Sequence, residues 1–235
     1  MIALPKLGKT FNFACQKGPE MKKKHPIERL IEQGEHQRQD FKFEVSDSRK
    51  IARTLSAFAN TDGGRLLIGV KDNGAIAGVR SEEEYYMIEA ASRMYTRPEV
   101  PFTATRWEVN GKTVLEIDIE PSRERPHLAP DKEGAYKAYI RVADENILAN
   151  EVLVLAWKKR RTPEGRLLRL SKPVELLLDW LDTRPYISAG GFCRLAHINY
   201  HVARGILSDL MAIGTLDYVV VDGHIAYKKQ LAADR

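Results

Sequence analysis

The chain has 235 residues, of which 43% are hydrophobic, and this is enough for one large domain or two smaller ones. Its net charge of +5 is mildly basic, which is compatible with a nucleic-acid partner and equally with ordinary surface solubility. Two distant cysteines without CxxC spacing argue against a zinc site or a disulfide framework, and no apolar run approaches the roughly 20 residues of a membrane helix. We therefore expect a cytoplasmic protein without membrane contacts.

The first part of the chain has little regular pattern. Residues 1–20 show no clear periodicity, and we predict a flexible N-terminal extension over residues 1–25. A short helix is predicted over 26–33, because Pro26 suits a first helical turn and apolar side chains recur on one face. Gly34 ends this helix. Residues 40–45 then alternate apolar and charged side chains, which is typical of a half-buried strand.

The next stretch organises the rest of the first domain. Apolar residues repeat at helical spacing from Ile51 to Ala59, and Ser46-Asp47-Ser48 can cap that helix. The segment from Asn60 to Gly64 stops the helix, since glycine tolerates the left-handed conformation that ends helices. After this segment we predict a buried strand, a tight turn and a returning strand, over residues 66–70, 72–74 and 75–79.

Several further elements are predicted before the pattern changes. Ser81 and Glu84 have the spacing of a capping box, which begins a helix that runs to Tyr95. Asn110-Gly111 is a strong hairpin signal between two strands. The predicted strands are 103–108, 113–119 and 138–142, the predicted loop is 121–130, and the last predicted helix of this region is 150–159.

A domain boundary is predicted at Thr162-Pro163-Glu164-Gly165, where charge, proline and glycine replace apolar periodicity. We therefore expect one domain over 26–160, a linker over 161–170 and a second domain over 171–235. The pattern predicts three helices with apolar faces and a β-hairpin in the second domain. This order of elements resembles that of a winged helix-turn-helix domain. The expected elements are 173–181, 192–196, 200–213, 216–221 and 224–228. The fold class is α+β.

Three blocks of the first domain resemble a known family. The central block is Ala57-Phe58-Ala59-Asn60-Thr61-Asp62-Gly63-Gly64, followed by Ile68-Gly69-Val70 and Gly74-Ala75-Ile76-Ala77-Gly78. Upstream lie Gly34-Glu35 and Asp40-Phe41-Lys42, and downstream lies Tyr139-Ile140-Arg141-Val142-Ala143. In this order the blocks resemble the Schlafen AlbA_2 domain over about Ile27 to Leu155, which implies a mixed β-sheet. The chain departs from the family at Asp40, where the family usually has Glu.

The resemblance implies a candidate catalytic and metal-binding cluster of Glu35, Asp40 and Asp72, which match the acids of the catalytic Schlafen nucleases. Three carboxylates at strand ends could hold Mg or Mn, and the metal would activate water for phosphodiester cleavage. The shorter Asp40 side chain alters that coordination geometry. The plainer alternative is that Glu35 and Asp40 are surface residues and that Asp72 only serves the turn before Gly74.

Basic and polar residues offer candidate nucleic-acid contacts in three places. Lys42 lies beside the acids, where it could neutralise phosphates or simply pair with those acids. The run Lys158, Lys159, Arg160 and Arg161 could follow a phosphate backbone, although cations at the end of a helix also complement its dipole. The third C-terminal helix would enter the major groove by its N-terminal part, and with the hairpin it provides Asn199, Tyr200, His201, Arg204 and Lys228.

Glycines at positions 63, 64 and 69 invite a nucleotide-binding interpretation. However, the chain contains no GxxxxGK[ST] loop, which supplies the lysine and the metal-binding hydroxyl of a phosphate cradle. We therefore interpret these glycines as residues of turns and of close backbone packing.

Together these features predict a nucleic-acid-binding protein, foremost a DNA-binding transcriptional regulator, with RNA as the second candidate ligand. From Glu151 onward the chain has 13 basic and 9 acidic residues, so the positive excess lies in the C-terminal third of the chain. Binding needs no cofactor, and a homodimer is expected because operator reading commonly uses dimers. The alternative is a metal-dependent ribonuclease that cleaves structured RNA such as tRNA. A third interpretation is an interaction module that docks another protein.

Overall fold

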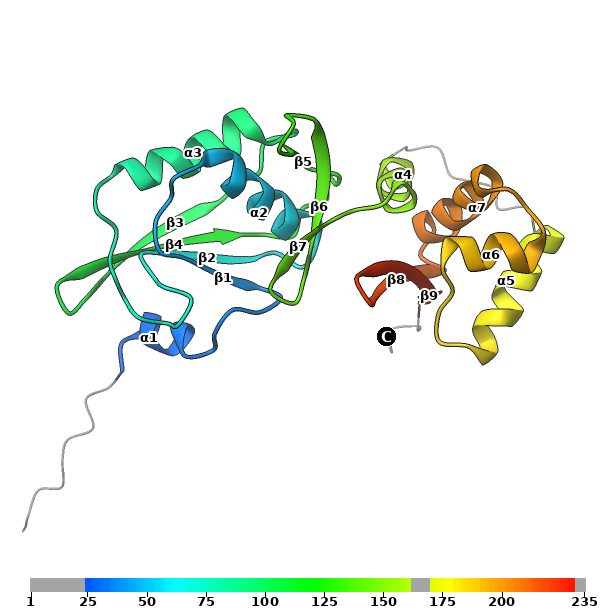
Figure 1. Ribbon diagram of the computed structural model, residues 1–235, viewed down its shortest axis with the longest axis horizontal. Helices are drawn as coiled ribbons and strands as arrows, with labels where there is room; N and C mark the ends of the chain where they lie inside the picture. Colours follow the sequence, from blue (N-terminus) through cyan, green and yellow to red (C-terminus); the bar gives the residue numbers. More distant parts are fainter. Residues whose placement is uncertain (1–23, 162–169, 231–235) are drawn as a thin grey trace, which may run out of the picture.

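The computed structural model describes residues 24–161 and 170–230 (Figure 1). The predicted extension over 1–25 and the predicted linker over 161–170 therefore lie almost entirely outside the described residues. Within the described residues, an α+β domain is followed by a group of helices and a β-hairpin. No helix in this part of the chain is long and apolar enough to cross a membrane.

A mixed four-stranded sheet forms the centre of the first domain. Its strand order is β1 (Gln39–Lys42), β2 (Gly64–Ile68), β4 (Lys112–Ile119) and β3 (Thr103–Val109). The first two strands are parallel and are connected by helix α2 (Ser48–Asn60), whereas β4 is antiparallel to both of its neighbours. The mixed sheet and the α+β class are as predicted.

The two faces of this sheet are covered by different helices. Alternate residues of a strand point to opposite faces. Leu66 and Ile68 accordingly join a core with α2 and with α3 (Glu83–Tyr95), while Leu67 joins a smaller core with α1 (Pro26–Ile31). Figure 1 shows α2 and α3 on one side of the sheet and α1 on the other.

Helix α2 begins and ends where the sequence predicts. At its N-cap, the Asp47 carboxylate accepts a hydrogen bond of 2.8 Å from the Arg49 backbone N–H. The chain leaves the helix through Gly63, whose φ is +68°. A Cβ at Gly64 would lie only 2.7 Å from the Phe58 ring, so β2 can approach the helix because this residue is glycine. The interpretation of these glycines as turn and packing residues is confirmed.

The predicted strand over 75–79 is wrong, because this segment forms only one isolated β-bridge, at Ile76. The backbone N–H groups of Ala77 and Gly78 both donate to the Gly69 carbonyl, at 2.8 and 2.9 Å. The segment therefore curls back on itself instead of continuing a ladder. A Cβ at Gly69 would lie 2.8 Å from the Gly78 backbone, so this glycine also allows close packing.

A second sheet has three antiparallel strands, β5 (Leu128–Pro130), β6 (Tyr136–Val142) and β7 (Glu145–Leu148). Strand β5 falls inside the segment predicted as a loop, and the sequence predicts no strand at β7. Both are short, and neither alternates apolar and polar residues over enough positions to be visible in the sequence. Their conformation depends on pairing with β6.

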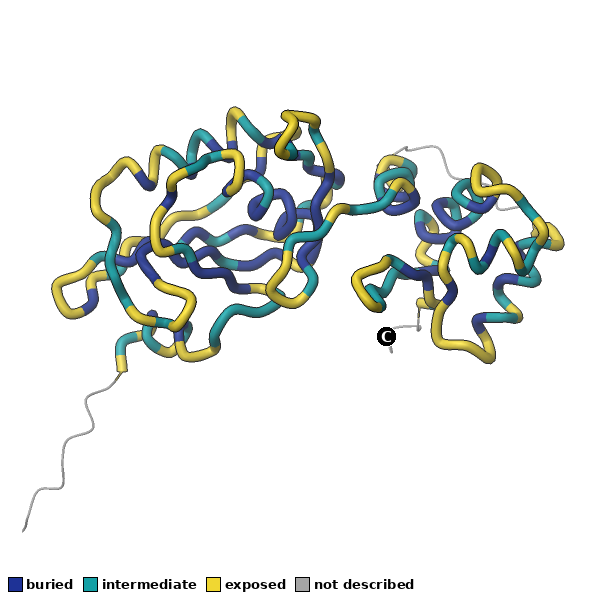
Figure 2. Tube along the Cα trace, in the orientation of Figure 1, coloured by how far each residue is buried: buried dark blue, intermediate teal, exposed yellow. Residues whose placement is uncertain are grey.

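The C-terminal part contains three helices and a hairpin, close to the predicted bounds. They are α5 (Lys172–Thr183), α6 (Ala189–Ala196), α7 (Tyr200–Ala212), β8 (Leu216–Val221) and β9 (His224–Lys229). Figure 2 shows buried stretches along the inner sides of these helices, with exposed residues at the loops.

Helix α4 (Glu151–Arg160) connects the two parts. Its buried residues Val152, Leu153, Ala156 and Trp157 belong to the same core as Leu207 and Leu210 of α7. That core also includes Ala138 and Ile140 of β6. The sequence places this helix in the first domain, whereas in the structure it packs between β6 and α7.

Candidate nucleic-acid interface and polar network

Two of the three predicted catalytic acids lie together. Glu35 precedes β1, and its Oε1 atom accepts a hydrogen bond of 2.8 Å from the Phe41 backbone N–H. Asp40 lies on β1 and is 4% exposed. Burial raises the pKa of Glu35, and the nearby Asp40 carboxylate acts in the same direction, against the Phe41 N–H that lowers it. Neither acid is therefore a freely solvated surface residue.

The Asp40 carboxylate is engaged by two cations. Arg141 Nη2 lies 3.1 Å from Asp40 Oδ1, and Lys42 Nζ lies 2.6 Å from Asp40 Oδ2. The Arg141 side chain is 1% exposed and the Asp40 side chain 6%, so this ion pair is buried. Lys42 thus pairs with an acid, which is the alternative that the sequence left open for it.

Asp72 lies apart from this pair, in an exposed turn. The Gly74 N–H donates to the Lys71 carbonyl at 2.8 Å across that turn. Among residues 24–161 and 170–230, no group of three or more His, Cys, Asp or Glu side chains is placed to hold a metal ion. Because Asp40 is already bound by two cations, the three predicted acids do not fit a Mg or Mn site as they are arranged here. Their catalytic role stays a prediction.

Arg141 is a central residue that sequence reasoning did not select. Besides Asp40, it donates to the Gln39 carbonyl at 3.2 Å and to Asn146 Oδ1 at 3.1 Å. Its guanidinium also lies 5.2 Å from the centroid of the Phe58 ring. The signal that could have revealed it is an arginine inside an otherwise apolar strand, since arginine is almost never fully buried without a partner.

Asn60 forms a second buried link that the sequence did not reveal. Its Nδ2 atom donates to the His127 carbonyl at 2.8 Å and to the Tyr139 carbonyl at 2.9 Å. Its Oδ1 atom accepts from the His127 backbone N–H at 2.8 Å. The side chain at the end of α2 therefore fixes both β6 and the segment before β5.

The His127 ring is buried and its tautomer can be assigned from its neighbours. Nδ1 lies 3.0 Å from the Pro98 carbonyl, which only accepts, so the proton is on Nδ1. Nε2 then accepts from the Ser122 hydroxyl at 2.7 Å. Burial lowers the pKa of His127 below its ordinary value. The ring is therefore a neutral structural group.

Two of the four predicted cations at the end of α4 bind α7. Lys159 Nζ lies 2.8 Å from Asp209 Oδ1 and donates to Ser208 Oγ at 2.7 Å. Arg160 donates to the Met211 carbonyl at 3.2 and 2.6 Å. These contacts favour the structural interpretation of both residues. Lys158 and Arg161 are exposed.

The first turn of α7 holds the predicted helix residues. Asn199 is the N-cap, and its Oδ1 accepts from the Val202 backbone N–H at 3.0 Å. Tyr200 and His201 are exposed. Arg204 is half-buried and pairs with Glu151 Oε2 at 2.7 Å, so it is connected to α4. On the hairpin, Lys228 is exposed.

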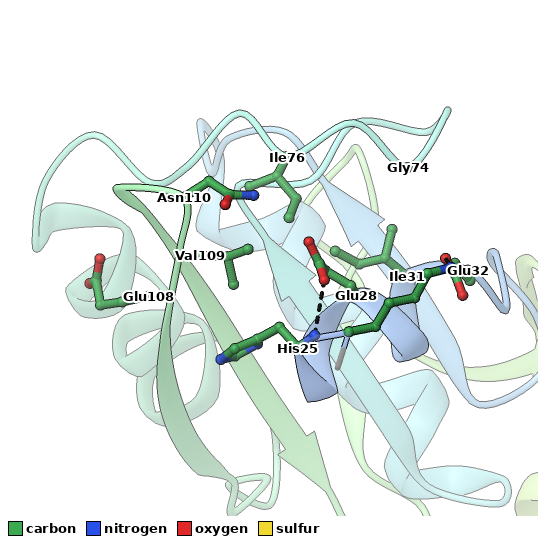
Figure 3. Close-up of a pocket in the computed structure, with 10 residues that line it drawn as sticks. His25, Glu28, Ile31, Glu32, Gly74, Ile76, Glu108, Val109 and Asn110 are labelled. Carbon is green, nitrogen blue, oxygen red and sulfur yellow. Dashed lines mark hydrogen bonds and ion pairs between the residues drawn. The ribbon is translucent and has the colours of Figure 1, made fainter. Parts of the chain in front are cut away.

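A cavity of about 590 Å³ lies beside α1 (Figure 3). It is lined in part by three acids, and each has a partner inside the chain. Glu28 accepts from the His25 backbone N–H at 2.9 Å, Glu32 pairs with Lys24, and Glu108 accepts a hydrogen bond of 2.5 Å from a β4 hydroxyl. The sequence did not indicate this cavity.

The fold and the polar network define the first domain as an α+β domain in which buried polar side chains connect a mixed sheet to a second, smaller one. The family model described as "Schlafen, AlbA_2" matches residues 35–150. Residues 35–150 therefore form a Schlafen AlbA_2 domain. No curated protein matches the chain.

Two solved structures are similar to part of the chain. One is the DIP2311 protein from Corynebacterium diphtheriae, with 20% identity and a TM-score of 0.39 over 61% of this chain and 29% of that chain. The other is the N-terminal domain of a RecG-related protein from Nitrosomonas europaea, with 18% identity and a TM-score of 0.33 over 63% of this chain and 97% of that domain. The match thus spans less than a third of the Corynebacterium protein.

Proposed function

We propose that this protein binds nucleic acid, foremost duplex DNA, and acts as a transcriptional regulator. In this proposal residues 171–235 act as a winged helix-turn-helix domain beside the Schlafen AlbA_2 domain in residues 26–160. The observation that carries the proposal is the exposed first turn of α7, where Tyr200 is 46% and Val202 is 41% exposed. The N-terminal part of a recognition helix is the part that reaches base edges in the major groove.

The order of elements supports the winged-helix assignment. Helices α5, α6 and α7 precede the β8–β9 hairpin, and the short connection between α6 and α7 passes through His197 in the left-handed conformation. The hairpin turns at Asp222-Gly223, so its tip could act as the wing that contacts an adjacent groove or backbone.

The exposed cations support a phosphate-binding surface. Lys158, Arg161 and Lys228 are exposed, and His201 lies on the first turn of α7. Such contacts position a protein on the duplex and make its affinity depend on salt. Lys159 and Arg160 hold α4 against α7, so in this proposal they act by placing the helix and not by contacting phosphate.

A homodimer remains part of the proposal, because two recognition helices reading two half-sites would supply the affinity that one lightly charged helix lacks. Sedimentation equilibrium with and without duplex DNA measures this directly. A protein that stays monomeric on DNA would remove the dimer from the proposal while leaving the binding activity in place.

The proposal is tested by fluorescence anisotropy with a pool of random duplexes at several salt concentrations. Wild-type affinity should fall as salt rises, and Tyr200→Ala/His201→Ala should weaken binding by about tenfold or more. Tyr86→Ala is the matched control, because Tyr86 is an exposed aromatic residue of α3. Absence of salt-dependent binding to any duplex or single strand would contradict the proposal.

The ribonuclease alternative is tested on the same samples with labelled tRNA, in Mn or in EDTA. We expect no cleavage that depends on the acids, since Asp40 is paired with Arg141 and Lys42. Metal-dependent cleavage that disappears in Glu35→Ala/Asp40→Ala, with the fold intact, would replace the regulator proposal by the nuclease.

A further inference from the structure

A polar cavity of about 450 Å³ lies where the β8–β9 hairpin meets the AlbA_2 domain, and we call it the seam cavity. Figure 1 shows the hairpin and α4 facing the end of the first domain that carries β6 and β7. Three arginines line the cavity, from three different segments. Its principal charged and polar residues are Asp62, Arg125, Arg141, Arg160, Asp217 and Tyr218.

Two of the three arginines of the seam cavity each have one N–H donor without an acceptor in the part of the chain that the structure describes. The Nε atoms of Arg125 and Arg141 are both buried without a hydrogen-bond partner among the described residues. Arg141 is 2% exposed, so water does not readily replace that partner. A guanidinium has five N–H donors, and a buried donor without an acceptor is costly. An acceptor-rich ligand would meet this need.

Arg141 is already paired with Asp40, and the two acids of the seam cavity have donors other than Arg125. Asp62 Oδ2 accepts from Gln37 Nε2 at 2.9 Å, and Asp217 Oδ1 accepts from the Tyr218 backbone N–H at 2.8 Å. Each of these carboxylates therefore already has a donor. Burial lowers the pKa of Arg125 and the nearby Arg160 acts in the same direction, whereas Tyr218 and Asp62 act to raise it.

Tyr218 supplies a hydroxyl from the hairpin side of the cavity. Burial raises its pKa to about 12, and Asp62 and Asp217 act in the same direction. The hydroxyl therefore keeps its proton at neutral pH and can donate a hydrogen bond. The cavity thus combines donors for an anion with carboxylates that can accept from hydroxyl groups.

We propose that the seam cavity binds a small phosphate ester that carries hydroxyl groups, the class of the sugar phosphates. The Nε–H groups of Arg125 and Arg141, which have no acceptor of their own among the described residues, would donate to the phosphate oxygens, and arginine is well suited to bind phosphate. Asp62 and Asp217 would accept from the hydroxyl groups of the ligand. The volume lies within the range of small-molecule sites, roughly 300 to 1,000 Å³.

This proposal goes beyond nucleic-acid binding because it assigns the protein a small-molecule ligand. The walls of the seam cavity come from both parts of the protein. A ligand there would contact Arg125 and Arg141 on one side and Tyr218 on the other. It would therefore hold the hairpin against the AlbA_2 domain and favour the arrangement seen here over others. The same chemistry could be offered by a free sugar phosphate or by the 5′-phosphate of a nucleic-acid strand.

The test is calorimetric titration of the full chain with ribose 5-phosphate at constant ionic strength, with ribose as the uncharged probe. We expect saturable binding of ribose 5-phosphate and none of ribose. Arg125→Gln should weaken binding by about tenfold or more, since it removes a charge-assisted donor. Arg29→Gln is the matched control, because Arg29 is an exposed arginine of α1 outside the cavity, and its affinity should equal that of the wild type.

Tyr218→Phe gives a second variant should Arg125→Gln fail to fold, and it should weaken binding several-fold. Absence of saturable binding to the wild type, or equal affinity in wild type, Arg125→Gln and Tyr218→Phe, would overturn the proposal. The source of the phosphate is resolved with short oligonucleotides that carry either a 5′-phosphate or a 5′-hydroxyl group. Preference for the 5′-phosphate strand over ribose 5-phosphate identifies a strand end, and the reverse identifies a free ligand. Random-duplex binding is measured separately, so its failure would leave this result intact.

Discussion

The two parts of the protein use polar residues in opposite ways. Twelve polar or charged residues are buried in the part of the chain that the structure describes, and Ser208 is the only one that follows Glu151. In the AlbA_2 domain the buried polar groups join segments that are far apart in the sequence, as Arg141 joins Asp40 and Asn60 joins Tyr139. In the C-terminal part an apolar core is surrounded by polar contacts at its edge, such as that of Arg204 with Glu151.

This difference separates two physical roles for charge. A buried ion pair must be satisfied within the protein, because removing one partner leaves an uncompensated charge. A charge at the edge of an apolar core contributes little to the stability of the fold, so its side chain is available to bind a partner molecule. The contrast predicts that polar substitutions are severe in the first part and mild in the second, whereas apolar truncations are severe in both.

The largest loss of stability is expected for Arg141→Met, because the buried Asp40 carboxylate then has Lys42 as its only cationic partner among the described residues. We expect a loss of about 4 kcal/mol in the free energy of unfolding, measured by urea denaturation followed by circular dichroism. Asp40→Asn in the same chain should restore part of this loss, because the unpaired charge is then gone.

Arg65→Met is the matched control for that prediction. Arg65 lies 3.7 Å from Glu116 and its side chain is 33% exposed, so its replacement should cost less than about 1 kcal/mol. A similar cost for both substitutions would remove the distinction between buried and peripheral charge.

A slightly smaller effect is expected from Leu207→Ala in the core of the C-terminal part. Leu207 is 0% exposed, and the resulting cavity should cost about 3 kcal/mol. Hydrogen exchange should then show loss of protection in α5, α6 and α7 while β1 and β2 keep theirs. Equal loss of protection in both parts would show that the core shared through α4 makes them one cooperative unit.

The pH dependence of stability should arise in the first part, at His127. Burial lowers the pKa of the folded ring below its ordinary value of 6.5, so the unfolded chain binds the proton first. The stabilisation is fully present above the unfolded pKa and is lost as the pH falls below it. Melting temperatures from pH 8 to pH 5 should decline in the wild type and change less in His127→Gln. His224→Gln, on the exposed hairpin tip, should keep the wild-type slope.

The smallest change in stability is expected for Glu151→Gln, which removes the ion pair between Glu151 and Arg204 at the edge of the C-terminal core. Glu151 is 66% and Arg204 30% exposed in their side chains, so stability should change by no more than about 0.5 kcal/mol. Affinity for duplex DNA should rise modestly, because a competing carboxylate is removed from the predicted contact residue Arg204. Weaker DNA binding in this variant would show that the ion pair holds α7 in its binding orientation.

Local signals in the sequence located most of the elements but not the links between them. The caps at Asp47 and Asn199 and the turn at Asn110-Gly111 each depend on a few neighbouring residues, and each is found as expected. Pairing between distant residues leaves no such local pattern. The sequence therefore selected Glu35, Asp40 and Asp72 as one cluster, although the partner of Asp40 is Arg141 and Asp72 lies in a separate turn.

Dependence on contacts between distant residues also explains the elements that the sequence does not predict. Strand β7 is four residues long and exists because β6 pairs with it. The curled segment around Ala77 is fixed by the Gly69 carbonyl, which two N–H groups share. In both places the conformation is decided by a contact outside the short window on which propensity depends.

The link between Asp40 and Arg141 has a consequence for synthesis on the ribosome. The two residues are 101 positions apart, so Asp40 is made long before its partner. At a translation rate of about 5 to 20 residues per second, roughly 5 to 20 seconds pass between the synthesis of Asp40 and that of Arg141. During that interval Lys42 is the only one of the two described partners of the Asp40 carboxylate that has been made, so we expect this edge of β1 to stay hydrated or in contact with a chaperone until β6 is translated.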